Sequence, residues 1–469
     1  MKIQLDDNIF KTISLAASQL NIKAYVVGGF VRDAIIGRNS KDIDIVAVGS
    51  GIELAREVAN MLNIKKVAVY KNFGTAQIKV HDIDIEFVGA RKESYQRNSR
   101  KPIVENGSLA DDQLRRDFTI NALAASLSKK DFGTVLAPFN GLDDLQNRII
   151  RTPLEPIITF NDDPLRMIRA IRFASQLGFD IESETYKAIS VNAERLKIVS
   201  IERIIDEFNK IILSPKPSVG IEMLEETGLL AIFFPQLVQL KGVENIEGKM
   251  HKDNFAHTLQ VVDQISLQSN DLWLRWSALL HDIGKPTSKH YNKETGWTFH
   301  GHEVTGAKMV EEIFRNLRLP LNEKLKYVQN LVGLHLRPIA LVHEVVTDSA
   351  VRRLLFEAGE NIEDLMQLAE ADITSKNEKK VQLYLKNFKT VRQKLKEVEA
   401  KDKIRNMQPP VSGKEIMKIF NLTPCKIVGD LKNEIKDAIL DGLVANERGA
   451  VLIYLFKIAK DKGIEPIIL

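Results

Sequence analysis

The chain has 469 residues, 44% of them hydrophobic and 27% charged, with a formal net charge of +4. This is the composition of a globular protein of about three domains, and it excludes a largely disordered chain. A single cysteine, Cys425, excludes a disulfide framework and a cysteine-rich zinc module. No apolar run reaches the ~18 residues of a membrane span. Asp6 and Asp7 stand where a signal peptide needs apolar residues, so we expect a cytoplasmic protein without a membrane partner.

The N-terminal part of the chain has the pattern of mixed strands and helices. Residues 24–27 are an apolar run that ends at Gly28-Gly29, which predicts a buried strand, a turn and then a helix from about Val31. Residues 42–46 and 81–87 alternate acidic and aliphatic side chains, as strands with one polar face do. We therefore expect a small mixed sheet with helices packed on it.

The acids of these two strands form a candidate metal site. Asp42 and Asp44 are two residues apart, so on a strand both carboxylates point to one face. Such like charges repel unless a cation lies between them, and carboxylate oxygens suit Mg²⁺. A third carboxylate from the neighbouring strand would complete a two-metal site, and the candidates are Asp82, Asp84 and Glu86. The alternative is a solvated face of the sheet.

Two glycines stand where the first strand meets the helix. At Gly28 and Gly29, backbone N–H groups can approach a phosphate without interference from Cβ atoms. Arg32 falls on the first helical turn and could hold a phosphate oxygen. A turn alone also explains a glycine pair, but the combination with Asp42 and Asp44 is more specific.

Five segments in a fixed order carry a resemblance to a known family. They are GGFVRD (residues 28–33), DIDIV (42–46), RRDFTINA (115–122), DDPLRMIRAIRFA (162–174) and ERIIDEFNKII (202–212). The set resembles the class II, or bacterial-type, tRNA nucleotidyltransferases and poly(A) polymerases over residues 24–240, half the chain. The resemblance implies that Asp42 and Asp44 hold catalytic Mg²⁺, with Glu86 as the third carboxylate and Asp84 as the alternative. Metal would activate the primer 3′-hydroxyl, align it on the α-phosphate and shield the leaving pyrophosphate.

The RRDFTINA segment supplies further nucleotide contacts by the same resemblance. Arg116 and Asp117 would contact the phosphates and ribose of the bound nucleotide, beside Gly28, Gly29 and Arg32 of the glycine turn. We expect Asn121, four residues after Asp117, to share its helical face. The alternative is a charge cluster at a helix N-terminus.

Asp163 and Arg166 offer a basis for choosing the base. They are three residues apart on a predicted helix, so both can face one ligand. Aspartate accepts and arginine donates, which matches the amino group and ring nitrogen of cytosine and adenine and mismatches guanine and uracil. The resemblance also places Arg169 and Arg172 near the nucleotide, but it has Glu where this chain has Asp162. The alternative is a basic helix face paired with acids.

Histidines are crowded in one part of the chain, since eight of the nine lie between His251 and His343. Metal ligation would explain the crowding, whereas chance and core packing are the alternatives. The pair His281-Asp282, with other histidines before and after it and a later aspartate, resembles the HD phosphohydrolase superfamily. By that resemblance the metal ligands are His257, His281, Asp282 and Asp372, and His302 and His335 add ligands for a second metal.

This donor set suits Mn, Fe, Ni, Co or Zn, and a bound water would hydrolyse a phosphoester. The alternative is a vestigial domain that keeps the fold with little activity.

From about Asp143 onward the pattern is mainly helical, without clear strand signals. Between Lys376 and Arg405, 11 Lys/Arg stand against 4 Asp/Glu, and this basic helix either follows a phosphate backbone or is a solvated face.

We therefore predict an α+β protein. A nucleotidyltransferase-type mixed sheet with helices (1–145) is followed by an all-α neck and body that selects the nucleotide and binds RNA (146–245), an all-α HD domain (246–375) and a helical tail (376–469). The predicted activity is template-independent addition of CCA to the tRNA 3′ end from CTP and ATP, with possible phosphohydrolysis in the HD domain. The alternatives are an A-adding enzyme or poly(A) polymerase, and an inactive RNA-binding protein. We predict no obligate protein partner.

Overall fold

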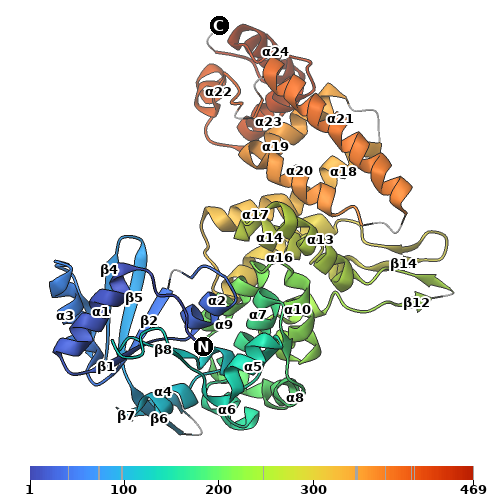
Figure 1. Cartoon of the computed structure of the whole chain (residues 1–469). Helices are drawn as coiled ribbons and strands as arrows, with labels where there is room; N and C mark the ends of the chain where they lie inside the picture. The colour runs from blue at the N-terminus through green and yellow to red at the C-terminus, as the bar shows by residue number, and fades with distance from the viewer. Residues whose placement is uncertain are drawn as a thin grey trace. The chain divides into compact units, whose positions relative to one another are not determined.

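The computed structural model describes residues 1–40, 42–71, 74–96, 99–246, 248–343, 347–374, 377–402, 404–405 and 407–467. The chain divides into two compact units, residues 1–235 and 236–469. The first contains a mixed sheet and helices, and the second is built almost wholly of helices (Figure 1). This confirms the predicted fold class, whereas the four domain boundaries stay predictions. Among the described residues, no helix combines the length and hydropathy needed to cross a membrane.

The sheet of the first unit has seven strands in the order β3-β4-β5-β2-β1-β8-β9. The strands β2 and β5 run parallel, and every other neighbouring pair in the sheet is antiparallel. Their bounds are β1 Lys23–Val27, β2 Asp42–Val48, β3 Ala68–Tyr70, β4 Thr75–Val80, β5 Ile83–Gly89, β8 Ala124–Ser126 and β9 Val135–Leu136.

Alternation of side chains decides which face of the sheet is buried. On β2 and β5, Ile43, Ile45, Ile85 and Phe87 are buried, while the acids between them point to the opposite face. Helix α3 (Gly51–Met61) packs on β2, β4 and β5, and α1 (Asn8–Gln19) packs on α3 and β1. The aliphatic half of each strand therefore builds the core, and the acidic half stays available for chemistry.

Further short elements connect the sheet to the helices of the first unit. A ribbon of β6 (Arg91–Gln96) and β7 (Ser99–Asn106) leads into α4 (Leu109–Leu114). The next elements are η2 Thr119–Asn121, η3 Pro138–Asn140, α5 Gly141–Gln146, β10 Ile149–Ile150, α6 Pro156–Asp162, α7 Leu165–Leu177, β11 Asp180–Ile181, α8 Ser183–Asn192, η4 Ala193–Ile198, α9 Ile201–Ile212, α10 Pro217–Glu226 and α11 Leu229–Phe233. Helix α2 (Gly29–Ile35) lies earlier in the chain, between β1 and β2, and begins in the glycine turn. Helix α7 packs on α9 and α10, and its Phe173 ring stands nearly perpendicular to the ring of Phe118, with the ring centres 5.8 Å apart.

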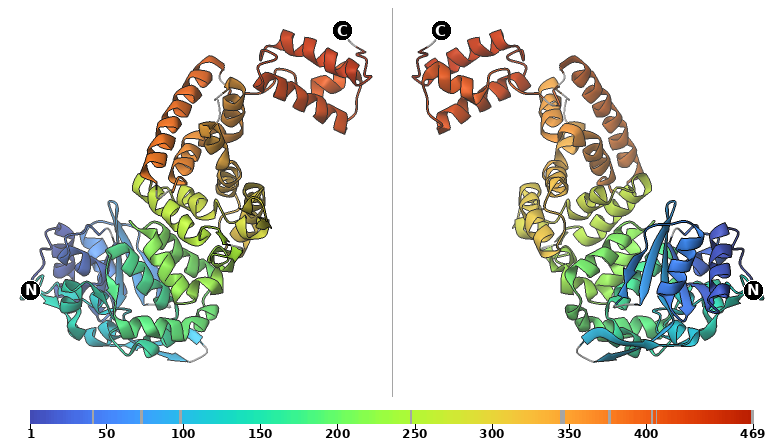
Figure 2. Two further views of the ribbon diagram at one scale, coloured as in Figure 1. Left: turned by 90° about the vertical axis from the view of Figure 1, so that its right-hand side faces the viewer. Right: turned by 90° about the vertical axis from the view of Figure 1, so that its left-hand side faces the viewer.

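The second unit is a series of packed helices with two small hairpins. Its elements are α12 Pro235–Val238, β12 Asn245–Ile246, β13 Lys249–Met250, α13 Asn254–Gln268, α14 Leu272–Leu280, α15 Lys285–Ser288, β14 His290–Asn292, β15 Gly296–Thr298, α16 His302–Asn316, α17 Glu323–Leu334, α18 Leu336–His343, α19 Asp348–Ala358, η5 Gly359–Asn361, α20 Ile362–Ala371, α21 Glu378–Asp402, α22 Gly413–Phe420, α23 Lys426–Leu440 and α24 Arg448–Asp461. Figure 2 shows α22, α23 and α24 gathered as a small cluster near the C-terminus. The two- and three-residue strands after Asp143 were missed because such short segments show no alternation.

The predicted basic helix is α21, and Lys376, where the basic stretch begins, lies outside the described residues. Phe388, Val391 and Leu395 are buried on one side of this helix, which packs on α18 and α19. Some of its cations are paired within the unit, since Arg392 binds Glu363 and Glu370.

Candidate functional site

The acids of β2 and β5 lie side by side in the parallel register. Asp44 is the Cα partner of Glu86, and Asp42 is the partner of Asp84. Burial raises the pKa of Asp44 against the opposing charge of Arg116, and burial with the charge of Asp44 raises the pKa of Glu86. This oxygen-only donor set on one face of the sheet fits Mg²⁺. The expectation that Asp82 shares the face is wrong, because it lies in the turn before β5.

The glycine turn brings Gly28 close to this acidic face. Gly28 has φ +74°, and a Cβ there would lie 2.9 Å from Nη1 of Arg116 and 3.7 Å from Oδ2 of Asp44. Only glycine therefore leaves room for these groups to converge. The predicted strand, turn and helix are confirmed, although α2 begins at Gly29 rather than near Val31. In the first turn of α2, Nη1 of Arg32 donates to Oδ1 of Asn121 at 2.7 Å.

The RRDFTINA segment is not the predicted helix. Helix α4 ends at Leu114, Phe118 is extended, and only a single 3-10 turn, η2, follows. Asp117 and Asn121 still meet, since Nδ2 of Asn121 donates to Oδ1 of Asp117 at 3.0 Å. A turn replaces the helix for two reasons. Oδ1 of Asp117 accepts from the N–H of Phe118, which offers the backbone an alternative to a helical bond. The buried ring of Phe118 also packs against Phe173.

A fully buried carboxylate that sequence reasoning missed fixes the two arginines of this segment. Asp112 accepts from Nε of Arg115 at 3.0 Å through Oδ1 and from Nε and Nη2 of Arg116 at 3.1 and 3.0 Å through Oδ2. The side chain of Asp112 is completely inaccessible to solvent. The signal in the sequence was an acid three and four residues before two arginines, a spacing that places them on one side of a helix.

Asp117 continues this polar network toward α7. Its Oδ2 accepts from Nε and Nη2 of Arg169 at 2.8 and 2.6 Å. Burial would raise the pKa of Asp117, but Arg169 and the Asn121 amide outweigh it and lower the pKa to about 2. Asp117 is therefore held as a buried carboxylate, because one oxygen accepts two N–H groups of Arg169 and the other accepts the Asn121 amide and the N–H of Phe118.

For Arg169 and Arg172 of α7, the sequence left open whether they lie near a nucleotide or form a basic helix face paired with acids. The structure shows the acid pairing for both. Nε of Arg172 lies 2.7 Å from Oε2 of Glu207 on α9, and Nη1 of Arg169 lies 3.8 Å from Oε1. Burial lowers the pKa of Arg172 to about 10, although Glu207 opposes the shift. The guanidinium of Arg172 also lies 3.9 Å from the centre of the Phe173 ring. Arg169 and Arg172 thus tie α7 to its neighbours.

Asp163 and Arg166 do not lie on one helix as predicted. Asp163 is extended between α6 and α7, because the proline that follows it disfavours helical backbone. Its Oδ1 accepts from the N–H of Leu165, and its Oδ2 lies 3.2 Å from Nη2 of Arg203. Arg166 lies in the first turn of α7 and donates through Nη2 to the carbonyl of Arg115 at 2.6 Å. Both side chains are half-buried, and Arg203 is a neighbour that the sequence did not reveal.

The second unit brings all six predicted histidine and aspartate ligands together. Potential ligand atoms of His257, His281 and Asp372 lie within 4.8 Å of one another, and those of Asp282, His302 and His335 form a second such group. Asp282 lies between the groups, with Oδ2 3.3 Å from Nε2 of His281 and Oδ1 3.2 Å from Nε2 of His302. A carboxylate with one oxygen toward each group suits two metals.

Hydrogen bonds to the backbone fix the orientation of three of these rings. The Nδ1 atoms of His281, His302 and His335 lie 2.7, 2.8 and 2.7 Å from the carbonyls of Ala278, Phe299 and Val332. If each Nδ1 donates, each Nε2 keeps a lone pair directed inward, as a metal ligand requires. The donor set therefore fits divalent transition metals.

The charges of the site favour a cation. Burial lowers the pKa of His281, but Asp282 and Asp372 outweigh it and raise the pKa to about 10, so a metal at this Nε2 would bind in place of a proton. Burial lowers the pKa of His335 to about 4, so this ring is neutral.

Gly284 packs the HD segment against α16, since a Cβ there would lie 2.2 Å from the carbonyl oxygen of His302. Lys285 donates to Oδ2 of Asp282.

Comparison of the chain with known proteins identifies its family. Models described as "Poly A polymerase head domain", "Probable RNA and SrmB- binding site of polymerase A" and "HD domain" match residues 24–151, 178–240 and 254–376. The "A-adding tRNA nucleotidyltransferase" of Deinococcus radiodurans is 31% identical over 88% of this chain and 91% of its own length. The chain belongs to the tRNA nucleotidyltransferase family.

Two other members of the tRNA nucleotidyltransferase family extend the comparison. The "A-adding tRNA nucleotidyltransferase" of Aquifex aeolicus is 33% identical over 73% of this chain, but this match spans only 44% of the Aquifex protein. The CCA-adding enzyme of Bacillus stearothermophilus, solved in complex with CTP, matches with a TM-score of 0.67 and 22% identity over 98% of this chain and 99% of that chain. At that identity the second likeness shows the fold alone.

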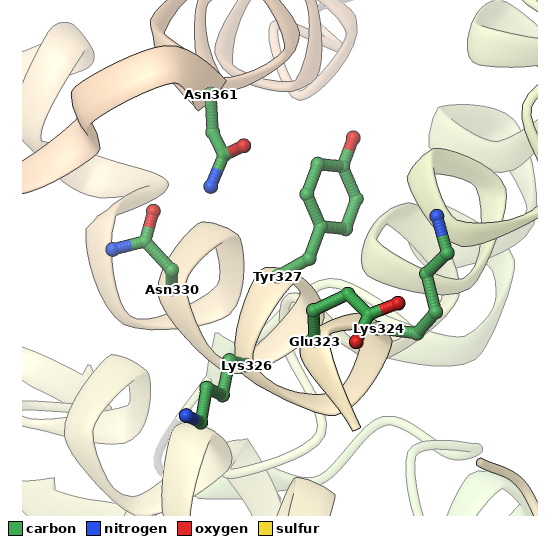
Figure 3. Close-up of a pocket in the computed structure, with 6 residues that line it drawn as sticks. All are labelled: Glu323, Lys324, Lys326, Tyr327, Asn330 and Asn361. Atoms are coloured by element: carbon green, nitrogen blue, oxygen red, sulfur yellow. The ribbon is translucent and has the colours of Figure 1, made fainter. Parts of the chain in front are cut away.

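The tRNA nucleotidyltransferase motifs do not account for one cavity in the second unit. It measures about 410 Å³ and is lined by residues of α17 together with Asn361. Figure 3 shows the Tyr327 ring between the amides of Asn330 and Asn361 on one side and Lys324 on the other. Tyr327 donates to Oδ2 of Asp364 at 2.7 Å, which anchors the ring.

Proposed function

We propose that the first unit is a template-independent nucleotidyltransferase that adds CCA to the 3′ end of tRNA from CTP and ATP. The observation that carries the proposal is the register of Asp42 and Asp44 against Asp84 and Glu86, beside the close approach of Gly28 and Arg116. Mg²⁺ bound by Asp42, Asp44 and Glu86 would supply activation of the 3′-hydroxyl and charge neutralisation at the triphosphate.

The protein's own groups position the nucleotide. The backbone at Gly28 and Gly29 leaves space for phosphate, and Arg116, held by Asp112, offers its guanidinium to the same space. Arg32, Asn121 and Asp117 form a connected set behind it, so the phosphate-facing groups are ordered before the nucleotide binds.

Base choice is assigned to Asp163 and Arg166, which adjoin the phosphate-binding groups through the contact of Arg166 with the backbone of Arg115. Asp163 accepts and Arg166 donates, a pairing that suits cytosine and adenine. Arg203, at 3.2 Å from Asp163, would order the acceptor. Replacement of Asp42 and Asp44 by Ala should abolish addition and leave tRNA binding within about twofold, because tRNA binding rests mainly on other contacts.

We propose a phosphohydrolase site in the second unit, with His257, His281 and Asp372 holding one metal and Asp282, His302 and His335 a second. Two facing groups of buried nitrogen and oxygen donors, with inward Nε2 atoms, support this proposal. A divalent metal there would supply an activated water for hydrolysis of a phosphate ester.

A second candidate for the transferase is addition of the terminal A alone. The names of the Deinococcus and Aquifex relatives favour it. The same site residues would serve either activity, so only the reaction products can distinguish CCA addition from addition of the terminal A. Incubation of a tRNA that lacks CCA with CTP alone separates the two: a CCA-adding enzyme extends it by two residues, and an A-adding enzyme leaves it unchanged.

A further inference from the structure

One cavity of the second unit shares no residue with the two groups of metal ligands. It measures about 410 Å³ and is lined by Glu323, Lys324, Lys326, Tyr327, Asn330 and Asn361. All of these residues except the last belong to the N-terminal part of α17, and Asn361 directly precedes α20. A volume of this size is typical of sites that hold a small ligand. The cavity is therefore a candidate binding site separate from both proposed active sites.

Hydrogen bonds between three helices hold the walls of this cavity in place. Tyr327 of α17 donates to Oδ2 of Asp364 on α20 at 2.7 Å, and Nδ2 of Asn330 donates to the carbonyl of Glu357 on α19 at 3.0 Å. Burial and the bond to Asp364 raise the pKa of Tyr327, so its hydroxyl stays protonated and its ring serves as a fixed surface. The walls are thus ordered before a ligand enters, which lowers the entropic cost of binding.

The charges that line the cavity favour an anion. Two ammonium groups, those of Lys324 and Lys326, stand against the single carboxylate of Glu323. Within the part of the chain that the structure describes, neither lysine forms an ion pair. Their N–H groups are therefore available to a phosphate, with which an ammonium makes charge-assisted hydrogen bonds.

The amides of the cavity can recognise a nucleobase. An asparagine amide both donates and accepts, which matches the amino group and ring nitrogen of adenine. Oδ1 of Asn330 is buried without a hydrogen-bond partner in the described part of the chain, and a donor from a ligand would remove the cost of this unpaired acceptor. Figure 3 shows the Tyr327 ring between the two amides and Lys324, so one ligand can contact amide, ring and ammonium. The flat ring adds a stacking surface for a base.

The two helices that border the cavity also carry metal ligands. His335 follows the last residue of α17 and Asp372 follows the last residue of α20, and each belongs to a different ligand group. The bond from Tyr327 to Asp364 joins the same two helices near their N-terminal ends. Because packed helices shift as rigid elements, a ligand that changes their spacing at the cavity also changes the spacing of His335 and Asp372.

We propose that this cavity binds an adenosine phosphate, which acts as an effector of the metal-ligand cluster. The adenine packs on Tyr327 with its edge at Asn330 and Asn361, and the phosphate binds the lysine ammonium groups. A free nucleotide and an adenosine within an RNA strand share this chemistry. Binding rests on the cavity alone, whereas the effect on the cluster rests on the proposed metal site.

Calorimetry with AMP and the full chain in metal-free buffer tests the phosphate contacts. The double variant Lys324→Ala, Lys326→Ala should weaken AMP binding by about tenfold or more, because the phosphate loses charge-assisted bonds. Adenosine, which has no phosphate, should bind this variant as it binds the wild type. The matched control is Lys308→Ala, Lys432→Ala, which removes two exposed lysines of α16 and α23 outside the cavity lining. Equal AMP affinity of the two double variants would overturn the site.

The Asn361→Ala variant tests recognition of the base. It should weaken binding of both AMP and adenosine, and it should keep the fold because the Asn361 side chain makes no capping bond to α20. Unchanged affinity for both would contradict the assignment of the base. The trinucleotide ApApA identifies the source of the ligand. If the lysine double variant weakens its binding as well, an RNA strand occupies the cavity, and if only AMP binding falls, the ligand is a free nucleotide.

Titration of Mn²⁺ with and without AMP tests the effect on the metal-ligand cluster. AMP should change the Mn²⁺ affinity of the wild type by about fivefold or more, and Mn²⁺ should change AMP affinity by the same factor, as linkage requires. The effect should persist in the control double variant and disappear in Lys324→Ala, Lys326→Ala. Its persistence in the latter would overturn the coupling. A wild type that binds no Mn²⁺ would overturn the metal site and the coupling, whereas the AMP measurements decide the binding site independently.

Discussion

The carboxylate of Asp112 holds the guanidinium of Arg116 by two hydrogen bonds, 3.1 and 3.0 Å, to the single oxygen Oδ2. Its other oxygen binds Arg115. Because Asp112 is fully buried and Arg116 lies at the glycine turn, the acid sets where the arginine points. We propose that Asp112 is a positioning residue, which acts on the nucleotide through Arg116.

Asp112→Asn should lower kcat/KM for nucleotide addition by about tenfold to a hundredfold, because a freed Arg116 loses its orientation toward the triphosphate. The effect should fall on phosphate recognition. We therefore expect ATP binding to weaken while AMP binding changes little, as measured by calorimetry.

Asp111→Asn is the control for this prediction. Asp111 caps the same helix through side-chain bonds to Ser108, and its backbone carbonyl accepts from the N–H of Arg115, a bond that the Asn substitution keeps. Its loss should slightly lower the stability of the helix and leave ATP and AMP affinity unaffected. If Asp111→Asn and Asp112→Asn lower activity equally, the role of Asp112 is in the stability of α4 alone.

The third carboxylate can be identified by comparing two acids on β5. Glu86 is in register with Asp44, and Asp84 is in register with Asp42. Glu86→Gln should reduce the rate of addition by about a hundredfold or more, as loss of a metal ligand does, and Asp84→Asn should have a much smaller effect. Single-turnover extension at saturating Mg²⁺ measures both, with Asp82→Asn in the preceding turn as the control. A larger loss for Asp84→Asn would assign the role to Asp84.

The Asp117–Arg169 pair should make stability depend on pH in the acid range. Because the folded state lowers the pKa of Asp117 to about 2 from an ordinary 3.8, the pair stabilises the folded chain fully above pH 4. This contribution, about 2 kcal/mol, is lost as the pH falls from 4 to 2. Urea unfolding of the wild type and Arg169→Met across this range should show a difference in unfolding free energy that shrinks toward pH 2. A constant difference would contradict the assignment.

The two ligand groups of the second unit predict a metal stoichiometry. Wild type should bind two divalent transition metals per chain at this site, measured by elemental analysis after dialysis. His335→Ala should reduce the content by one, because His335 belongs to the group of Asp282 and His302. Asp282→Asn, which touches both groups, should lower it by more. Unchanged content in His335→Ala would argue for one metal.

Transferase activity serves as the independent readout for these variants. His281→Ala and Asp282→Asn should remove phosphate-ester hydrolysis and spare nucleotide addition, since the two sites use different residues of the chain. Coupled loss of both activities would argue against independent sites.

Sequence reasoning succeeded where local pattern decides structure. The alternation at Asp42, Asp44 and Glu86 placed all three on one sheet face, and the spacing of Asp282 beside His281 with the other histidines pointed to ligands that the structure brings together. Both signals come from side-chain periodicity, which the fold preserves.

Sequence reasoning failed where a single local interaction, or a contact with a distant segment, determined the conformation or the partner of a residue. Pro164 removed Asp163 from the helix, and a turn at His81, with φ +54°, removed Asp82 from the strand. The pairing of Arg172 with Glu207 and of Asp163 with Arg203 joins segments about 40 residues apart, and no pattern within one segment reports such contacts.

The most direct measurement uses three tRNAs that end before CCA, after C and after CC. Each is incubated with Mg²⁺ and CTP, ATP or both, and the products are sized at nucleotide resolution. The account predicts two C additions followed by a single A, all lost in the Asp42→Ala, Asp44→Ala variant. Addition of A to the CC-ending tRNA alone would establish the A-adding candidate, and long A tails or no extension of any tRNA would contradict the account.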